Sequence, residues 1–209
     1  MNFLWVGNDR CLDFVNTEAW KKGLLVDLLD EFDDLVRWLV EARAMSRETA
    51  KAVVRRWRDR REGTRTLAEA RRLRRALRDL AEALAIGAPV SPAVVTRLNT
   101  LLRRRVGQNQ LVRTRRGFRR AFCFTPSSPN DLLVPVAEAA VHLLCDVEPA
   151  LVRKCANPKC VLLFLDRTKN HQRRWCSPAS CGNRAKVAAH YRRRARTRAR
   201  PRIPRGGEV

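Results

Sequence analysis

The sequence predicts a mainly α-helical protein, in which a helical N-terminal domain with a small β-hairpin precedes a treble-clef-like zinc knuckle and a basic helix. Apolar residues recur at intervals of three and four over much of residues 27–105, as on the buried face of a helix. Leu111-Val112 on one side and the alternating Phe118, Phe122 and Phe124 on the other flank Arg115-Arg116-Gly117, which is typical of two strands joined by a turn. Two cysteine pairs near the C-terminus indicate a metal-stabilised module. We expect the helical domain over residues 1–148, the knuckle with its helix over 149–198, and a disordered basic tail over 199–209.

Capping residues and breakers divide the helical region into five expected helices, at residues 27–43, 46–61, 66–86, 91–105 and 130–144. The expected N-caps are Ser46, Thr66, Ser91 and either Asn130 or Asp131. Gly63 should end the second helix, while Pro92 and Pro135 fall in first turns, where proline is tolerated. Between the fourth and fifth helices, residues 106–124 should form the hairpin. The apolar segment 11–17 is too short to distinguish helix from strand.

The charge of the chain is large and uneven. The formal net charge is +23 over 209 residues, yet 45% of the residues are hydrophobic, which is enough for a packed core. Residues 1–152 hold 27 Lys and Arg against 19 Asp and Glu, whereas residues 153–209 hold 17 against 2. This asymmetry favours a nucleic acid as partner of the C-terminal part. An anionic membrane surface, or a basic tail that only aids solubility, are the alternatives.

The cysteine content points to a reducing compartment. The chain has seven cysteines, an odd number, and three of them stand singly in apolar surroundings, where we expect buried thiols: Cys11, Cys123 and Cys145. Charged residues interrupt the N-terminal apolar segment, so it does not resemble a secretory signal. No apolar run approaches the roughly 18 residues that span a bilayer. We therefore expect a cytoplasmic protein without a membrane partner.

The four C-terminal cysteines have metal-ligand spacing. Cys155 and Cys160 are separated by four residues, fifteen residues follow, and Cys176 and Cys181 repeat the first spacing. Four thiolates form a closed tetrahedral site, so we expect one structural Zn²⁺ whose removal unfolds residues 153–196. Four reduced thiols packed in a core are the alternative, which the hydrophilic flanking residues disfavour. We expect His171 to lie at the surface or against the backbone.

A basic helix should open at Gly182 and present the contact surface. Its apolar stripe, expected to dock on the knuckle, consists of Val187, Ala188, Tyr191 and Ala195. The expected nucleic-acid contacts are Arg173, Arg174, Arg184, Lys186, His190, Arg193 and Arg194. Base reading cannot be separated here from phosphate contact, and a solvated basic face is the alternative. Trp175 should cover the thiolates, and Asp166 should hold an arginine or shape a turn.

The N-terminal domain carries a polar cluster within an apolar segment. Asp13, Asn16 and Thr17 could line a small-molecule pocket, or act as helix caps and core hydrogen-bonding groups. No glycine-rich phosphate loop, no HExxH motif and no nucleophile elbow occurs, and the three histidines are scattered. We therefore do not expect an enzyme.

These motifs resemble those of a known family. The four cysteines, Phe164-Leu-Asp166, Arg173-Arg-Trp-Cys-Ser177 and Cys181-Gly-Asn-Arg184 resemble the CGNR zinc finger. Leu12-Asp-Phe-Val-Asn-Thr17 resembles the start of the ABATE domain that commonly precedes that finger. Val161 stands where the family usually has glycine, and Thr168 where it tends to have serine.

The resemblance implies a bacterial, stress-induced transcription regulator whose finger binds DNA and whose ABATE domain senses a ligand. We expect a zinc-dependent DNA-binding protein with a helical domain that senses a small-molecule effector or forms a homodimer. An RNA-binding or ribosome-associated zinc protein is the alternative.

Overall fold

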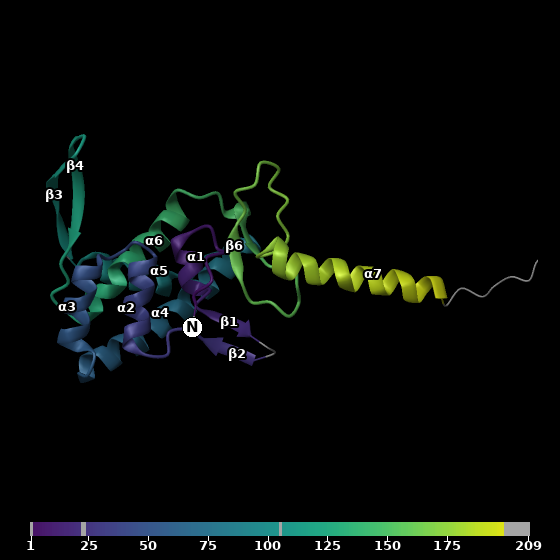
Figure 1. Ribbon diagram of the computed structural model, residues 1–209, viewed down its shortest axis with the longest axis horizontal. Coiled ribbons are helices and arrows are strands. Elements are labelled where there is room, and N and C mark those ends of the chain that lie inside the picture. Colours follow the sequence, from purple (N-terminus) through teal and green to yellow (C-terminus); the bar gives the residue numbers. More distant parts are fainter. Residues whose placement is uncertain (1, 22–23, 105, 199–209) are drawn as a thin grey trace, which may run out of the picture.

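The computed structural model describes residues 2–21, 24–104 and 106–198, and these residues form a mainly α-helical protein, as predicted (Figure 1). The helices are α1 (Arg10–Val15), α2 (Phe32–Glu41), α3 (Arg47–Trp57), α4 (Arg61–Ala85), α5 (Pro92–Leu102), α6 (Val134–Cys145) and α7 (Asn183–Arg198). Shorter helical turns are η1 (Pro129–Leu133), η2 (Pro149–Leu151) and η3 (Pro178–Gly182). Three antiparallel two-stranded sheets pair β1 (Glu18–Lys21) with β2 (Leu24–Asp27), β3 (Gly107–Thr114) with β4 (Gly117–Phe124), and β5 (Val152–Lys154) with β6 (Leu163–Leu165). The expected tail over 199–209 lies outside the described residues.

The 25-residue helix α4 is the centre of the core. Its buried side chains repeat at helical spacing, among them Leu73, Leu77 and Leu80, and α1, α2, α3, α5 and β5 all pack against it. Burial of such a stripe supplies most of the stability of an amphipathic helix. The segment 11–17, left undecided by the sequence, is mostly helical: α1 buries Leu12 and Phe14 completely against α4 and α6.

The expected boundary between the second and third helices was wrong. Gly63 lies inside α4, where a Cβ atom would stand 2.3 Å from the carbonyl oxygen of Trp57. The glycine therefore permits the close approach of α3 to α4 and does not end a helix. Thr66 is likewise not a cap: it is buried within α4 and its hydroxyl donates to the Asn130 side chain at 2.8 Å.

The expected start of the first helix at residue 27 was also wrong. Residues 24–27 form β2, and α2 begins only at Phe32 after a capping box of Glu31 and Asp34. The reason is tertiary: the carboxylate of Asp27 accepts hydrogen bonds from Arg74 of α4 at 2.6 and 2.5 Å. Fixing Asp27 in this ion pair holds the chain extended before α2.

The remaining starts agree with the sequence, with one exception. Ser46 caps α3 through the backbone N–H of Thr49, and α5 begins at Pro92 after Ser91. The hairpin β3–β4 is confirmed over residues 107–124. The last helix, by contrast, starts from a capping box of Ser128 and Asp131 and passes through η1 before α6.

The single cysteines do not all behave as expected. Cys11 is completely buried, but Cys123 is half-buried and Cys145 is exposed. Cys123 lies on the projecting hairpin and Cys145 at the end of α6. For these two thiols, apolar neighbours in the sequence did not predict burial in the core.

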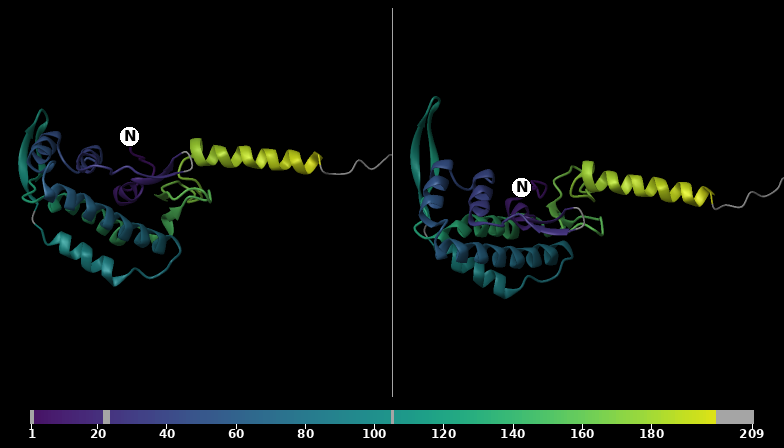
Figure 2. Two further views of the ribbon diagram at one scale, coloured as in Figure 1. Left: turned by 90° about the horizontal axis from the view of Figure 1, so that it is seen from below. Right: turned by 60° about the horizontal axis from the view of Figure 1, so that its bottom comes forward.

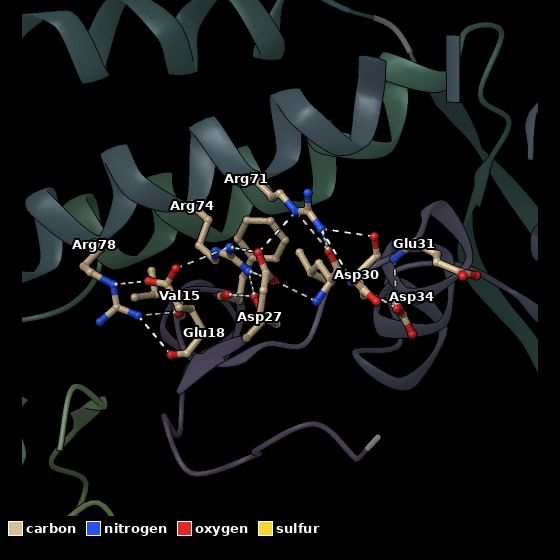
Figure 3. Close-up of polar contacts among 12 residues, drawn as sticks. Val15, Glu18, Asp27, Asp30, Glu31, Asp34, Arg71, Arg74 and Arg78 are labelled. Carbon is tan, nitrogen blue, oxygen red and sulfur yellow. Dashed lines mark hydrogen bonds and ion pairs between the residues drawn. The ribbon is translucent and has the colours of Figure 1, made fainter. Parts of the chain in front are cut away.

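Three arginines on one face of α4 bind the N-terminal segment (Figure 3). Arg74, 1% exposed, pairs with Asp27 and donates to the Thr17 hydroxyl at 3.1 Å. Arg71 donates to the carbonyl of Leu29. Arg78 donates to the carbonyl of Val15 at 2.9 Å and to that of Val161 at 2.7 Å. Because Val161 lies between the cysteine pairs, α4 holds the zinc knuckle as well as the N-terminal segment.

Strand β6 of the knuckle is attached to the core of the helical domain. The Asn16 side chain, completely buried after α1, donates to the Leu163 carbonyl at 2.8 Å and accepts from the Leu163 N–H at 3.0 Å. Leu163 and Leu165 belong to the large core, whereas Phe164 between them packs with the cysteines. The alternation of a strand thus places β6 between two cores.

We expect Arg74→Met to reduce the free energy of unfolding by about 3 kcal/mol, because it leaves the half-buried Asp27 carboxylate without its main partner. Burial raises the pKa of Asp27, but the hydrogen bonds from Arg74 outweigh it and lower that pKa, so this contribution should be lost as pH falls below about 4. Urea unfolding of both proteins measures the change. The control is Arg72→Met, which removes the exposed pair with Glu69 and should change the free energy of unfolding far less, because solvent screens an exposed ion pair. Equal losses in the two variants would contradict the assigned role of Arg74.

Candidate zinc site and nucleic-acid interface

The four predicted cysteines converge on one point. The sulfur atoms of Cys155, Cys160, Cys176 and Cys181 all lie within 4.8 Å of one another, and Cys160 Sγ and Cys176 Sγ are 3.8 Å apart. A tetrahedral site with Zn–S bonds of ~2.3 Å places its sulfurs about 3.8 Å apart, so the cluster has the dimensions of a zinc site. Three of the cysteines are buried and Cys160 is half-buried, and four thiolates fill the tetrahedral shell of a structural Zn²⁺.

Hydrogen-bond donors surround the sulfurs. The backbone N–H of Cys176 donates to Cys155 Sγ at 3.4 Å, and the side chains of Asn157 and Arg184 donate to Cys181 Sγ at 3.4 and 3.3 Å. Such donors stabilise thiolates and orient them toward a metal. Asn157, which lies between the first two cysteines, thus helps to orient a sulfur of the second pair.

The thiols cannot ionise independently at this spacing. Hydrogen bonds from Cys160 and Cys176 lower the pKa of Cys155 to about 2, while the same bond to Cys155 raises the pKa of Cys160 to about 11. The pKa of Cys176 is raised further for the same reason. A divalent cation at the centre favours all four thiolates together, so the cluster fits Zn²⁺ better than four free thiols.

Asp166 and Arg173 organise the loop between the cysteine pairs. The buried Asp166 carboxylate accepts the N–H groups of Thr168 and Arg173 and lies 3.7 Å from Arg153, so it both shapes the turn and meets an arginine. His171 lies at the surface with Nδ1 3.2 Å from the Asp166 carbonyl, as expected. Trp175 packs against the cysteine cluster, which confirms that it covers the thiolates.

The structure places Arg173 inside the knuckle. Its guanidinium donates to the carbonyls of Val6, Cys176 and, through Nε, Trp175, and lies 4.1 Å from the centre of the Phe164 ring. These bonds fasten the N-terminal segment to the knuckle. The neighbouring Arg174 is exposed, with its guanidinium 5.5 Å from the Trp175 ring. Both arginines were predicted to contact nucleic acid, but only Arg174 is exposed.

Helix α7 projects away from the rest of the molecule (Figures 1 and 2). Only its start packs on the knuckle, through η3. The expected docking of its apolar stripe was wrong: Ala188 is exposed, and Val187 and Tyr191 are 47% and 67% exposed. The side chain of Ala195 lies outside the described residues. Among the described residues, no element packs beside Val187, Ala188 and Tyr191 to cover them.

The basic side chains of α7 from Arg184 to Arg194 are exposed. The predicted contact residues that are exposed are Arg174, Arg184, Lys186, His190, Arg193 and Arg194. Residues 183–198 contain seven Lys or Arg and no Asp or Glu, and no acidic residue occurs from 167 to 207. The sequence of α7 therefore contains no acidic residue to offset its own positive charge.

The three residues proposed for a pocket lie in different environments. Asn16 binds β6, and the Thr17 hydroxyl donates to the Phe14 carbonyl at 2.7 Å while accepting from Arg74. Asp13 lines a cavity of about 480 Å³, together with Trp5, Asn8, Asp9, Arg10, Glu41, Ala42, Arg43, Glu138, Ala139, His142 and Arg167. Only Asp13 of the three thus faces a space that a ligand could enter.

The sequence did not identify Arg167 or Gly7 as parts of this region. Arg167 belongs to the knuckle, so the cavity joins the knuckle to the helical domain. Gly7 donates its N–H to Asp13 Oδ1 at 2.7 Å and accepts from the Leu165 N–H at 2.7 Å. A Cβ atom there would lie 2.8 Å from Asp13 Oδ1, so glycine permits the contact. A glycine three residues before α1 is the only signal in the sequence.

The fold and the site define a protein in which a helical domain carries a structural zinc finger with a basic helical arm. Residues 8–147 match the ABATE family, described as "Putative stress-induced transcription regulator", and residues 152–194 match the CGNR zinc finger. The chain belongs to the ABATE family and ends in a CGNR finger whose four cysteines hold one structural zinc ion. A search of curated proteins finds no match. Neither family is described as an enzyme, and among the described residues no helix has the length and apolar composition that crossing a membrane requires.

We expect one zinc ion per purified chain, and none in Cys181→Ser, because three thiolates lose the closed tetrahedral shell. Without the metal, the loops that carry the cysteines should become accessible to trypsin, with new cleavage between Arg167 and Arg184. Elemental analysis and mass spectrometry of the digest measure both effects. The exposed Cys145→Ser serves as control and should keep its zinc. A zinc-free wild-type protein whose knuckle resists trypsin would contradict a structural metal.

We expect Asp13 to titrate near pH 6, because burial raises its pKa to about 6 against the bonds from Gly7 and Val6. A raised carboxyl pKa means that the folded state holds a proton that the unfolded state loses, so stability falls as pH rises from about 4 to 6. Relative to the wild type, Asp13→Asn should therefore gain stability across this window. Asp131→Asn is the control of opposite sign, since hydrogen bonds from Ser128 and Arg104 outweigh burial and lower the pKa of Asp131. Urea unfolding at pH 4 and pH 7 decides, and parallel pH profiles for wild type and Asp13→Asn would contradict the raised pKa.

Proposed function

We propose that this protein is a zinc-dependent, DNA-binding transcription regulator whose principal DNA contact is α7. The observation that carries the proposal is the projection of an acid-free, basic helix from a zinc-stabilised base. A helix of this kind fits the major groove of B-DNA, where arginine can contact guanine edges and lysine or arginine can contact phosphates. The zinc ion fixes the base of the helix and takes no part in chemistry.

Within this proposal the basic residues have separate roles. Arg174, Arg184, Lys186, His190, Arg193 and Arg194 supply the contact surface, whereas Arg173 supports it from inside the knuckle. Arg184 donates to Cys181 Sγ and to the Ser180 hydroxyl, so it links the metal site to the start of α7. The exposed Val187 and Tyr191 would meet DNA without prior separation from the knuckle, and their apolar surface suits thymine methyl groups.

We assign the helical domain a sensing role through the cavity beside Asp13. The cavity is lined by residues of both the ABATE region and the knuckle, and it contains Arg10, Arg43 and Arg167 as well as acidic groups. An effector bound there would touch Arg167 of the knuckle directly, and Asp13 through Gly7 contacts the segment that Arg173 binds. A ligand could thus alter the position of the knuckle without reaching α7.

The alternative proposal is an RNA-binding or ribosome-associated protein with the same arm. The deep, narrow major groove of A-form RNA does not admit a helix, so an RNA target would have to offer single strands or irregular structure. Binding of duplex DNA, structured RNA and single strands in one buffer separates these targets.

We expect Arg193→Ala/Arg194→Ala to weaken duplex binding and to flatten its salt dependence, by about 0.9 in the log–log slope for each lost phosphate contact. Fluorescence anisotropy with a mixed-sequence duplex between 50 and 200 mM salt measures both quantities. The control is Arg65→Ala/Arg75→Ala, which removes the same charge from exposed positions of α4 and should leave the slope unchanged. If both double variants matched the wild type, α7 would be a solvated helix and the proposal would fail.

A further inference from the structure

A second basic element projects from the molecule at the end remote from α7. The hairpin β3–β4 extends beyond the helices near α3, whereas α7 leaves the opposite end, and all views agree on this arrangement (Figures 1 and 2). Only its base joins the core: Val106 and Phe124 are buried, and the Thr125 N–H donates to the Val106 carbonyl at 2.6 Å. The eight residue pairs of β3 and β4 form a two-stranded ribbon, and no third strand of the described residues pairs with it.

One face of the ribbon carries exposed apolar side chains among arginines. The register pairs Arg113 with Phe118, Leu111 with Arg120 and Asn109 with Phe122, and directly paired residues share a face. On that face Leu111, Phe118 and Phe122 are 74%, 68% and 55% exposed. A lone hairpin gains little stability from such residues, so their presence on a projecting ribbon indicates a binding surface.

The charge of the ribbon selects the partner. Residues 107–124 contain five arginines, namely Arg113, Arg115, Arg116, Arg119 and Arg120, and no acidic residue occurs between Glu82 and Asp131. A second copy of the chain would bring the same cations face to face, and charged edge strands oppose pairing of this kind. A polyanion would pair with the arginines. Among polyanions, a nucleic acid also offers planar bases that can stack on the phenylalanine rings.

We infer that the β3–β4 hairpin is a second nucleic-acid contact, in which its arginines bind phosphates and Phe118 and Phe122 contact bases. The inference rests on the proposed function, because α7 supplies the first contact with the same nucleic acid. Two-stranded ribbons enter DNA grooves, and apolar side chains on them can wedge between base steps. Arg115 and Arg116 form the turn, so the tip of the ribbon meets the backbone while the rings follow on one face.

Two double variants separate the two kinds of contact. Arg115→Ala/Arg116→Ala removes charge from the exposed turn, and Phe118→Ala/Phe122→Ala removes the exposed rings; neither pair lies in the core. Arg65→Ala/Arg75→Ala again controls for charge, and thermal unfolding checks that all variants fold. The probe is a mixed-sequence duplex of about 40 base pairs, long enough to exceed one helical arm, titrated by anisotropy at several salt concentrations.

The arginine variant should lose about tenfold in affinity and flatten the salt slope, because it releases fewer counterions. The phenylalanine variant should lose about tenfold at every salt concentration with an unchanged slope, because apolar contact releases no counterions. Wild-type affinity and slope in both hairpin variants, with the effect of the α7 variant intact, would overturn this inference alone. If the wild type fails to bind nucleic acid, the proposed function fails first. If the wild type were a dimer and the phenylalanine variant a monomer, the ribbon would instead be a self-association surface. If the hairpin variants lost binding only to phosphatidylserine vesicles, the ribbon would be a membrane contact.

Discussion

The buried side-chain amide of Asn16 ties strand β6 of the zinc finger to the helical domain, and the position of the finger depends on this contact. The Asn16 side chain forms both hydrogen bonds that a neighbouring strand would offer to Leu163, so β6 is held as if a third strand lay beside it. Arg78 adds a second tie through the Val161 carbonyl. Polar groups buried this completely are costly unless paired, and here the finger itself supplies the partners.

The ties explain why a small metal module can carry a long arm. Zinc orders the cysteine loops, while the helical domain holds β5 and β6 through Asn16, Arg78 and the burial of Leu163. Helix α7 needs no side support, because its base is fixed by the zinc site and by η3. Helix α7 and the β3–β4 hairpin, which both carry arginines and no acidic residue, project from opposite ends of the packed body (Figure 1).

Local signals in the sequence predicted much of this structure. The cysteine spacing identified the zinc ligands, and Ser46, Ser91 and the hairpin turn were placed correctly because caps and turns depend on nearby residues. The errors came from contacts between elements that only the fold brings together. Asp27 was assigned to a helix because its partner, Arg74, lies 47 residues away, and Gly63 read as a breaker because the carbonyl of Trp57 that it accommodates is visible only in the fold.

The candidate site shows the same division. The residue types of Asp13, Asn16 and Thr17 indicated a polar cluster, but only the fold directs Asn16 to β6 and Asp13 to the cavity.

The most direct test of the attachment of β6 to the helical domain is hydrogen–deuterium exchange with and without zinc. We predict that chelation exposes the amides of residues 155–160 and 166–182 while those of β6 stay protected, in contrast to the unfolding of all of 153–196 expected from the sequence. Loss of protection in β6 together with the cysteine loops would contradict the account.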